Sequence, residues 1–373
     1  MNKLEKLVEN APDLSFELAD GTSVVRLGVI ATVYFKDGYT AEKKLKIIEC
    51  FRRFHDEFGA NLKGLLQDSY KTLTSTTLEK AITKIQTSSG NDRCELHLTS
   101  ATSTKEAASY GISTLNSREI HEDSERSYIK LVFPWEFITT DEGRGNYKAW
   151  VTYLCNQVEA EHGYGGLSSI LPFDYDSYMP IEFELSQKYS GLDVDSMPHS
   201  LASELVNHIK GVNWQSIIGN SFIENLGGES VLRQKLSGSG NIDIVNYDNG
   251  VIIQAGEYPE LGPIGEGGLD SYIAVNRILK LLRNPEPDQL HHYSPYGNCF
   301  EEHSTNLWYE RFDQNESIAP PSRIESNKPC TKDGYWFTPA KANSRKFFKQ
   351  GELMPSFNDS DWGDTLWYWS GEE

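Results

Sequence analysis

The sequence predicts an α+β fold, a two-layer sandwich in which helices cover a largely antiparallel sheet. Three observations support this class. TSVVRLGVIATVYF (residues 22–35) is a long β-branched run with the composition of a central strand. Residues 41–58 follow it with the periodicity of an amphipathic helix. Asn249-Gly250 stands between two β-rich runs, which is a strong short-range signal for a β-hairpin.

The first half of the chain alternates strand and helix patterns. Thr40 is a suitable N-cap for the helix over residues 41–58. Residues 94–100 and 127–135 predict two further strands, joined by the polar loop REIHEDSER (118–126). The apolar residues of the first helix recur at helical spacing and are Leu45, Ile48, Phe51, Phe54 and Phe58.

A second helical pattern runs over residues 147–163 and is expected to end at Gly163, before a strand in YGGLSSILP (164–172). These elements give the order β-α-β-β-α-β, with an extra helical or loop insert at about residues 61–90.

The second half repeats a similar order. Helices are predicted over residues 175–189, 199–209, 229–236 and 270–283, and NLWYERF (306–312) predicts a final strand. Two ferredoxin-like β-α-β-β-α-β halves are therefore one organisation of this sheet. The predicted domains are an N-terminal segment (1–21), a main domain (22–312, with halves 22–172 and 173–312) and an irregular acidic-aromatic C-terminal extension (313–373).

The C-terminal extension ends in FNDSDWGDTLWYWSGEE, which mixes acids with aromatic residues. Its aromatic side chains either pack back onto the protein or form an arm that meets a partner, and packing is favoured because exposed aromatic clusters promote aggregation. The residues concerned are Asp359, Asp361, Trp362, Asp364, Trp367, Tyr368, Trp369, Glu372 and Glu373.

Charge is the strongest global signal, with 35 Lys and Arg against 54 Asp and Glu and a net charge of −19. An acidic surface repels phosphate backbones, so direct binding to nucleic acid is disfavoured. Long-range attraction would instead speed association with a basic partner. The simpler alternative is that the acidic surface only keeps the protein soluble.

The chain has neither the apolar start of a secretory signal nor an apolar run that would span a bilayer. Its five cysteines are scattered and never form CxxC, which is typical of reduced thiols. These features predict a cytoplasmic protein without a membrane anchor.

No motif predicts catalysis, a cofactor site or a metal site. The chain lacks a GxSxG elbow, and LGPIGEGGLD (261–270) lacks the lysine of a phosphate-binding loop. HHYSPYGNCFEEH (291–303) does not have the spacing of a known zinc motif. GLDVD (191–195) reads as a turn bearing acids, and Trp214 as a core anchor. We therefore expect a protein that is not an enzyme.

A series of motifs nevertheless resembles a known family. The motifs are RLGVIATVYFKDGYTAEKKLKIIECFRRF, YSGLDVD, IKGVNWQSIIGNSFIENLGGE and GVIIQAGEYPELG, and with the helix after them they cover about residues 22–285. Together they resemble the type VI secretion immunity family, formerly a bacterial domain of unknown function. The resemblance implies a cytoplasmic immunity protein that binds an effector toxin. Relatives neutralise nuclease effectors such as VRR-Nuc toxins by occluding the active site, and no catalytic residues carry over.

Candidate contact residues are acids and one aromatic residue on predicted loops, where binding residues concentrate. They are Glu122, Asp123 and Glu125 in REIHEDSER, Asp141 and Glu142 in TTDEGRG, Asp174, Tyr175 and Asp176 in FDYD, and Glu266 in the glycine-rich loop. Two alternatives remain open at this point. One is a hydrolase that reverses a toxin's modification, and the other is a regulatory or scaffold protein of the secretion system.

Overall fold

The computed structural model describes residues 3–239, 241–264, 269–313, 324–330, 333–338, 340–341, 344–357 and 365–371. Its contacts divide the chain into two compact units, residues 1–312 (unit 1) and residues 313–373 (unit 2). In the described part of the chain no helix is long and apolar enough to cross a membrane. Helices and antiparallel sheets together confirm the predicted α+β class.

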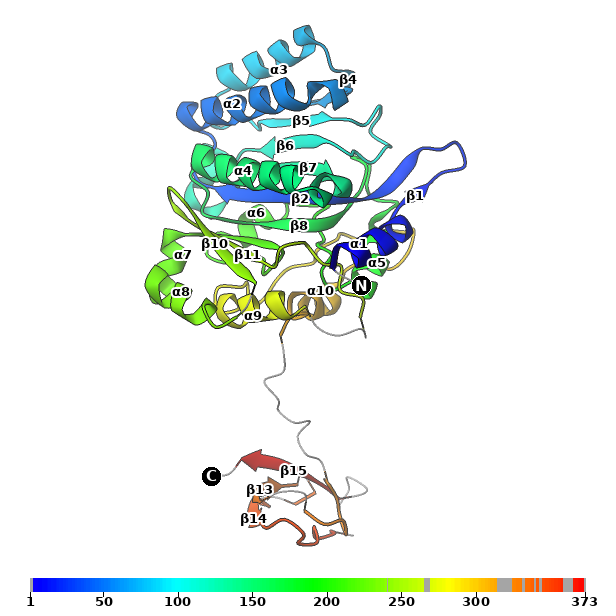
Figure 1. Ribbon diagram of the computed structural model, residues 1–373, viewed down its shortest axis with the longest axis vertical. Coiled ribbons are helices and arrows are strands. Elements are labelled where there is room, and N and C mark those ends of the chain that lie inside the picture. The colour runs from blue at the N-terminus through cyan, green and yellow to red at the C-terminus, as the bar shows by residue number, and fades with distance from the viewer. Residues whose placement is uncertain are drawn as a thin grey trace. The chain divides into compact units, whose positions relative to one another are not determined.

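Unit 1 is built on one sheet whose neighbouring strands are all antiparallel (Figure 1). The strand order is β10-β11-β9-β8-β2-β7-β6-β5-β3-β4, and β1 also pairs with β2. The strands are β1 (Phe16–Glu17), β2 (Ser23–Phe35), β3 (Gly64–Leu66), β4 (Tyr70–Thr72), β5 (Glu95–Thr99), β6 (Gly111–Leu115), β7 (Ser127–Pro134), β8 (His162–Ile170), β9 (Gln215–Gly219), β10 (Ile242–Tyr247) and β11 (Gly250–Ala255).

Helices cover one face of this sheet, with α2 and α4 packed against each other (Figure 1). The opposite face is covered only in part, by α6, α10 and the loops next to them. The helices are α1 (Lys3–Asn10), α2 (Ala41–Phe58), α3 (Ser75–Thr87), α4 (Asp141–Val158), α5 (Met179–Lys188), α6 (Leu201–Glu204), α7 (Asn220–Asn225), α8 (Glu229–Leu236), α9 (Asp270–Leu279) and α10 (Glu302–Tyr309).

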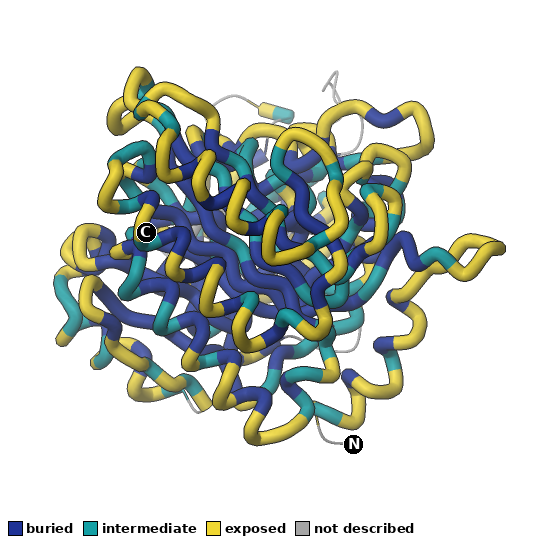
Figure 2. Tube along the Cα trace, turned by 90° about the horizontal axis from the view of Figure 1, so that it is seen from above, coloured by how far each residue is buried: buried dark blue, intermediate teal, exposed yellow. Residues whose placement is uncertain are grey.

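The central strand β2 confirms the prediction for residues 22–35. Its side chains alternate between the two faces, as strand geometry requires. Val29 and Val33 join the core under the helices, whereas Ile30 and Tyr34 join the smaller core on the other face. Figure 2 shows the resulting band of buried strands between exposed outer surfaces.

Helix α2 has the predicted bounds, and Thr40 caps it by accepting a hydrogen bond from the Lys43 N–H. Four of the five apolar residues predicted for its inner face are buried. The prediction for Leu45 is wrong, because its side chain is 50% exposed and Ile47 packs into the core instead. A period of 3.6 residues places 47, 48, 51, 54 and 58 on one face and turns 45 away from it.

The predicted helix end at Gly163 is also wrong. Helix α4 stops at Val158, Glu159 adopts a left-handed conformation, and β8 begins at His162. Glycine is needed inside β8 because α4 lies very close to it. A Cβ on Gly165 would stand 2.2 Å from the Tyr147 hydroxyl, which donates to the Ile30 carbonyl at 2.6 Å.

Two further predictions need correction. NLWYERF lies in helix α10 and the turn after it rather than in a strand, because Glu301 and Ser304 form a capping box and Trp308 and Tyr309 turn into the core. The insert at 61–90 contains β3, β4 and α3, and β6 falls in a stretch for which no element was predicted.

The duplication into two ferredoxin-like halves is not confirmed. Strands of both proposed halves belong to one continuous sheet, joined where β8 pairs with β9. The described residues after 172 add only β9, β10 and β11 to this sheet, which is too few for a second β-α-β-β-α-β unit. The hairpin at Asn249-Gly250 is confirmed, with Tyr247 paired to Gly250.

Unit 2 contains a second antiparallel sheet, so its description as irregular is wrong. The strand order is β12-β15-β13-β14, formed by β12 (Ile324–Glu325), β13 (Gly334–Phe337), β14 (Lys346–Phe348) and β15 (Leu366–Gly371). Trp336, Phe348 and Trp367 form its buried core. These large aromatic side chains alternate with outward-facing residues, which lets very short strands enclose a core.

The core under the helices depends on Phe54, whose ring contacts Phe58, Phe133 and Trp150 at centroid distances of 4.9, 5.8 and 5.6 Å. We expect Phe54→Ala to lower the free energy of unfolding by roughly 3–5 kcal/mol, because the lost ring leaves a cavity. Urea unfolding followed by circular dichroism measures this. Leu45→Ala on the exposed side of the same helix is the control and should change stability by less than about 0.5 kcal/mol.

Candidate functional site

A pocket of about 750 Å³ lies on the sheet face opposite α2 and α4, over β5, β6 and β7. Strand β5 shows why this face is polar. Leu96 and Leu98 are buried in the core under the helices, whereas Glu95, His97 and Thr99 alternate with them and are half-buried. A pocket of this size falls within the usual range for binding sites.

The polar floor of the pocket is organised around Glu95. Its carboxylate accepts hydrogen bonds from Arg93 at 3.1 Å and pairs with His97 at 2.9 Å. Burial acts to raise the pKa of Glu95, but His97 and Arg93 outweigh it and hold the pKa below its ordinary value. The carboxylate is therefore ionised at neutral pH.

The rim of the pocket combines acids with aromatic rings. Asp174 accepts a hydrogen bond from the Thr104 hydroxyl at 2.7 Å, and Asp176 lies 3.1 Å from His292. Tyr175 between them is half-buried, and burial raises its pKa. Three exposed aromatic side chains complete the rim and are Phe173, Tyr293 and Tyr296.

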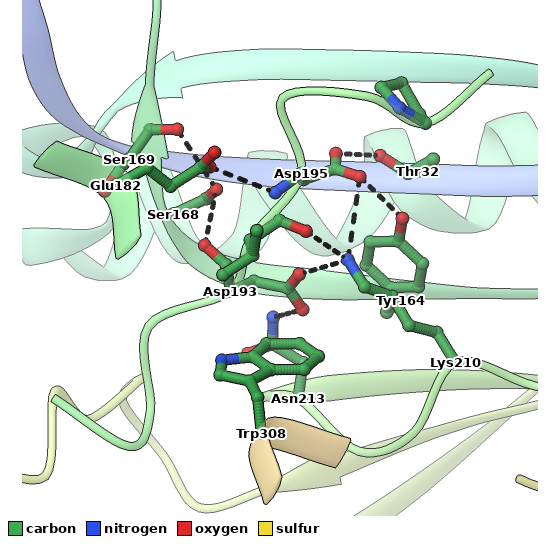
Figure 3. A network of polar contacts seen from close by, with 12 residues as sticks. Thr32, Tyr164, Ser168, Ser169, Glu182, Asp193, Asp195, Lys210, Asn213 and Trp308 are labelled. Carbon is green, nitrogen blue, oxygen red and sulfur yellow. Dashed lines mark hydrogen bonds and ion pairs between the residues drawn. The ribbon is translucent and has the colours of Figure 1, made fainter. Parts of the chain in front are cut away.

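A buried network of charges supports the floor of the pocket (Figure 3). Asp195, 1% exposed, accepts hydrogen bonds from Tyr164 at 2.6 Å and Thr32 at 2.8 Å. The ammonium groups of Lys130 and Lys210 lie 3.0 and 3.9 Å from its carboxylate. Burial acts to raise the pKa of Asp195, but the two lysines outweigh it and hold the pKa below its ordinary value.

Asp193 occupies the second carboxylate position of this network. Lys210 lies 2.6 Å from it, and the Asn213 amide donates to its other oxygen at 2.7 Å (Figure 3). Its own backbone carbonyl accepts from Ser168 at 3.0 Å, which fixes the loop on β8. GLDVD is therefore a buried, charge-bonded segment, whereas the sequence predicted only a turn bearing acids.

Glu182 extends the network toward the segment that carries the rim tyrosines. It accepts from the Asp195 N–H at 3.3 Å and lies 2.8 Å from His291, with both side chains fully buried. The neighbouring His292 pairs instead with Asp176. The two adjacent histidines thus serve different partners, and the described residues contain no group of three metal-binding side chains.

The structure brings only one set of predicted contact residues to the pocket, namely Asp174, Tyr175 and Asp176. Glu122, Asp123 and Glu125 lie in or just after the 3-10 turn before β7; Asp123 is 3.7 Å from Lys36, and Glu125 is 3.6 Å from His121.

Asp141 and Glu142 are exposed in the first turn of α4, where acids stabilise the helix terminus, and Asp141 pairs with Arg144. Strand β7 separates these two acidic sites by roughly 25 Å. Glu266 lies outside the described residues.

Sequence reasoning missed several pocket residues, which are Arg93, Glu95, His97, Lys130, His199, Tyr293 and Tyr296. His199 was interpreted as a surface histidine, but it is half-buried in the pocket wall and burial lowers its pKa. The alternation of ELHLT did contain a usable signal, since it places Glu95 and His97 together on one face of a strand. No local pattern shows which face the helices leave open.

The buried pair Asp195 and Lys210 gives a stability prediction. Asp195→Asn should lower the free energy of unfolding by roughly 3–5 kcal/mol at pH 7, because it leaves buried ammonium groups without their carboxylate. Urea unfolding compares it with Glu184→Gln, an exposed acid that should change stability by less than about 0.5 kcal/mol. A loss below 1 kcal/mol for Asp195→Asn would contradict the importance of the network.

His162 gives a pH prediction. Burial lowers its pKa from 6.5 to about 3 in the folded protein, so the unfolded chain binds a proton that the folded chain excludes. We expect stability to fall as pH decreases from 6.5 toward 3, with a slope of up to about 1.4 kcal/mol per pH unit from this group. Unfolding measured across this range should lose that part of the slope in His162→Gln but keep it in the exposed control His303→Gln.

Comparisons with known proteins agree with this architecture. A solved structure described as Pseudomonas aeruginosa T6SS protein PA0821 matches with a TM-score of 0.74 and 21% identity, over 86% of this chain and 94% of that chain. No curated protein matches the sequence. The family model described as type VI immunity for VRR-NUC (TsiV) matches residues 46–312 and thus most of unit 1. The predicted family is confirmed, and the chain belongs to the TsiV family of type VI immunity proteins.

Proposed function

We propose that this protein binds a cognate type VI effector nuclease of the VRR-Nuc class and neutralises it by covering the active site. Family membership carries this proposal, because the family model is described as immunity to such effectors. The protein acts in this scheme as a stoichiometric inhibitor without catalysis of its own. It is expected in the cytoplasm, where the nuclease would act on DNA.

The charge of the chain supports this mode of action. A nuclease needs a basic surface around its active site to hold the phosphate backbone, and this chain carries a net charge of −19. Carboxylates can occupy the positions that phosphates would take, and long-range attraction accelerates the encounter. Protection of a cell requires tight binding, with a free energy of about −12 kcal/mol or better.

The pocket rim is the best candidate for the contact surface. It combines Asp174 and Asp176 with exposed aromatic rings, and Tyr293 and Tyr296 are 84% and 66% exposed. Aromatic anchors surrounded by charged groups are typical of binding hot spots. The network beneath holds the loops that bear this rim, so the surface is preorganised and loses little entropy on binding.

A titration of the effector tests the proposal. Nuclease activity is measured while this protein is added in fixed molar steps, and we expect activity to fall with a break near one equivalent. Full activity at excess protein would contradict the proposal. Loss of activity at a small fraction of an equivalent would favour the hydrolase alternative, because an enzyme turns over.

Charge-reversal variants locate the contact surface in the same assay. Asp174→Lys with Asp176→Lys should weaken inhibition at least ten-fold, by removing two attractive charges and adding two repulsive ones. Asp56→Lys on the helix-covered side is the matched control, since this acid is 83% exposed and should change inhibition less than two-fold. A larger effect from Glu122→Lys with Asp123→Lys would place the interface at the opposite end of β7 instead.

A further inference from the structure

Unit 2 lies outside the residues that match the immunity family, and one face of its sheet carries a group of aromatic rings. Register decides which residues share this face. Tyr335 is paired with Phe347 and Phe337 with Tyr368, and directly paired residues in antiparallel strands point to the same side. Tyr335 and Phe337 are two residues apart, so all four rings lie on one face.

These rings form a surface rather than a core. The core residues Trp336 and Trp367 alternate with them along the same strands and are buried on the other side. Phe337 and Phe347 remain 40% and 41% exposed. Phe337 and Tyr368 have ring centroids 5.8 Å apart and an angle of 32° between their planes, so they lie nearly parallel as neighbours.

Basic side chains gather beside this aromatic face. The guanidinium of Arg345 lies 4.2 Å from the centre of the Tyr335 ring. Residues 341–351, which lead into and out of β14, contain four Lys or Arg and no acid. The nearest described acids, Asp333 and Glu352, accept backbone hydrogen bonds from Gln350 and Lys349 beyond the end of β14.

We propose that the aromatic face of unit 2 binds single-stranded nucleic acid, with unpaired bases stacked on Phe337, Phe347 and their neighbours and phosphates near Arg345. Exposed rings on a four-stranded sheet with basic residues beside them are the arrangement by which proteins hold single strands without reading sequence. This binding is separate from the proposed inhibition of the effector and does not depend on it.

Two features favour a nucleic acid over a protein partner at this face. Strand addition is disfavoured, because the edge strands β12 and β14 have only two and three residues. Bases need only ring faces and local cations, both of which are present. The net charge of the chain disfavours binding in general, but charges beyond about 8 Å are screened at physiological salt, so the local basic residues decide.

Fluorescence anisotropy of labelled oligothymidylate and oligouridylate with the full-length protein tests the proposal. We expect dissociation constants on the order of 10⁻⁶ to 10⁻⁴ M, weaker at higher salt. Phe337→Ala combined with Phe347→Ala should weaken binding ten-fold or more. Leu353→Ala, an exposed apolar residue in the same unit, is the matched control and should leave binding unchanged. Circular dichroism confirms that each variant is folded.

Three outcomes would overturn the proposal. They are absence of binding to either oligonucleotide, equal binding of a duplex whose bases are already stacked, and unchanged affinity in the double variant. Sedimentation velocity separates one alternative occupant. If the wild-type protein binds no oligonucleotide but self-associates, and the double variant is monomeric, the face is an interface between two copies of the chain and not a nucleic-acid site.

Discussion

The pairing of two buried carboxylates with buried ammonium groups is the constraint on which the organisation of unit 1 depends. Asp193 and Asp195 lie on the sheet face opposite the helices, where an unpaired charge would cost several kcal/mol. Lys210 contacts both acids, and Lys130 reaches Asp195 from β7. The segment that carries the acids must therefore lie against β2 and β8, which brings Glu182 and the loop after it into place.

This arrangement explains why the sheet has an open polar surface at one end. The charged segment, α6 and α10 cover the part of the face over β2 and β8. Nothing in the described part of the chain extends this cover over β5 and β6, where Glu95 and His97 line the pocket instead. The acidic and aromatic rim stands at the border between the two regions, on loops that the buried charges anchor. A protein that must meet a basic partner thereby presents a rigid surface of the opposite charge.

The two units offer surfaces of different chemistry. Unit 1 matches the immunity family and presents carboxylates around a pocket. Unit 2 encloses its own small core around Trp336 and Trp367, and its other face carries aromatic rings beside a basic segment. Because each unit has its own core, the aromatic face can be altered without disturbing the folding of unit 1. The two proposed activities are therefore separable by substitution.

The sequence by itself determined the α+β class, the central strand, helix α2 and the hairpin at Asn249-Gly250, because these depend on local periodicity and turn chemistry. It also carried the family, through a series of motifs in a fixed order. Only the tertiary structure decided that Asp193 and Asp195 are buried, that NLWYERF begins in a helix, and that Asp174 and Asp176 meet Glu95 at one pocket. These features depend on which strands pair and which face the helices leave open, and contacts between residues far apart in the chain have no local signature.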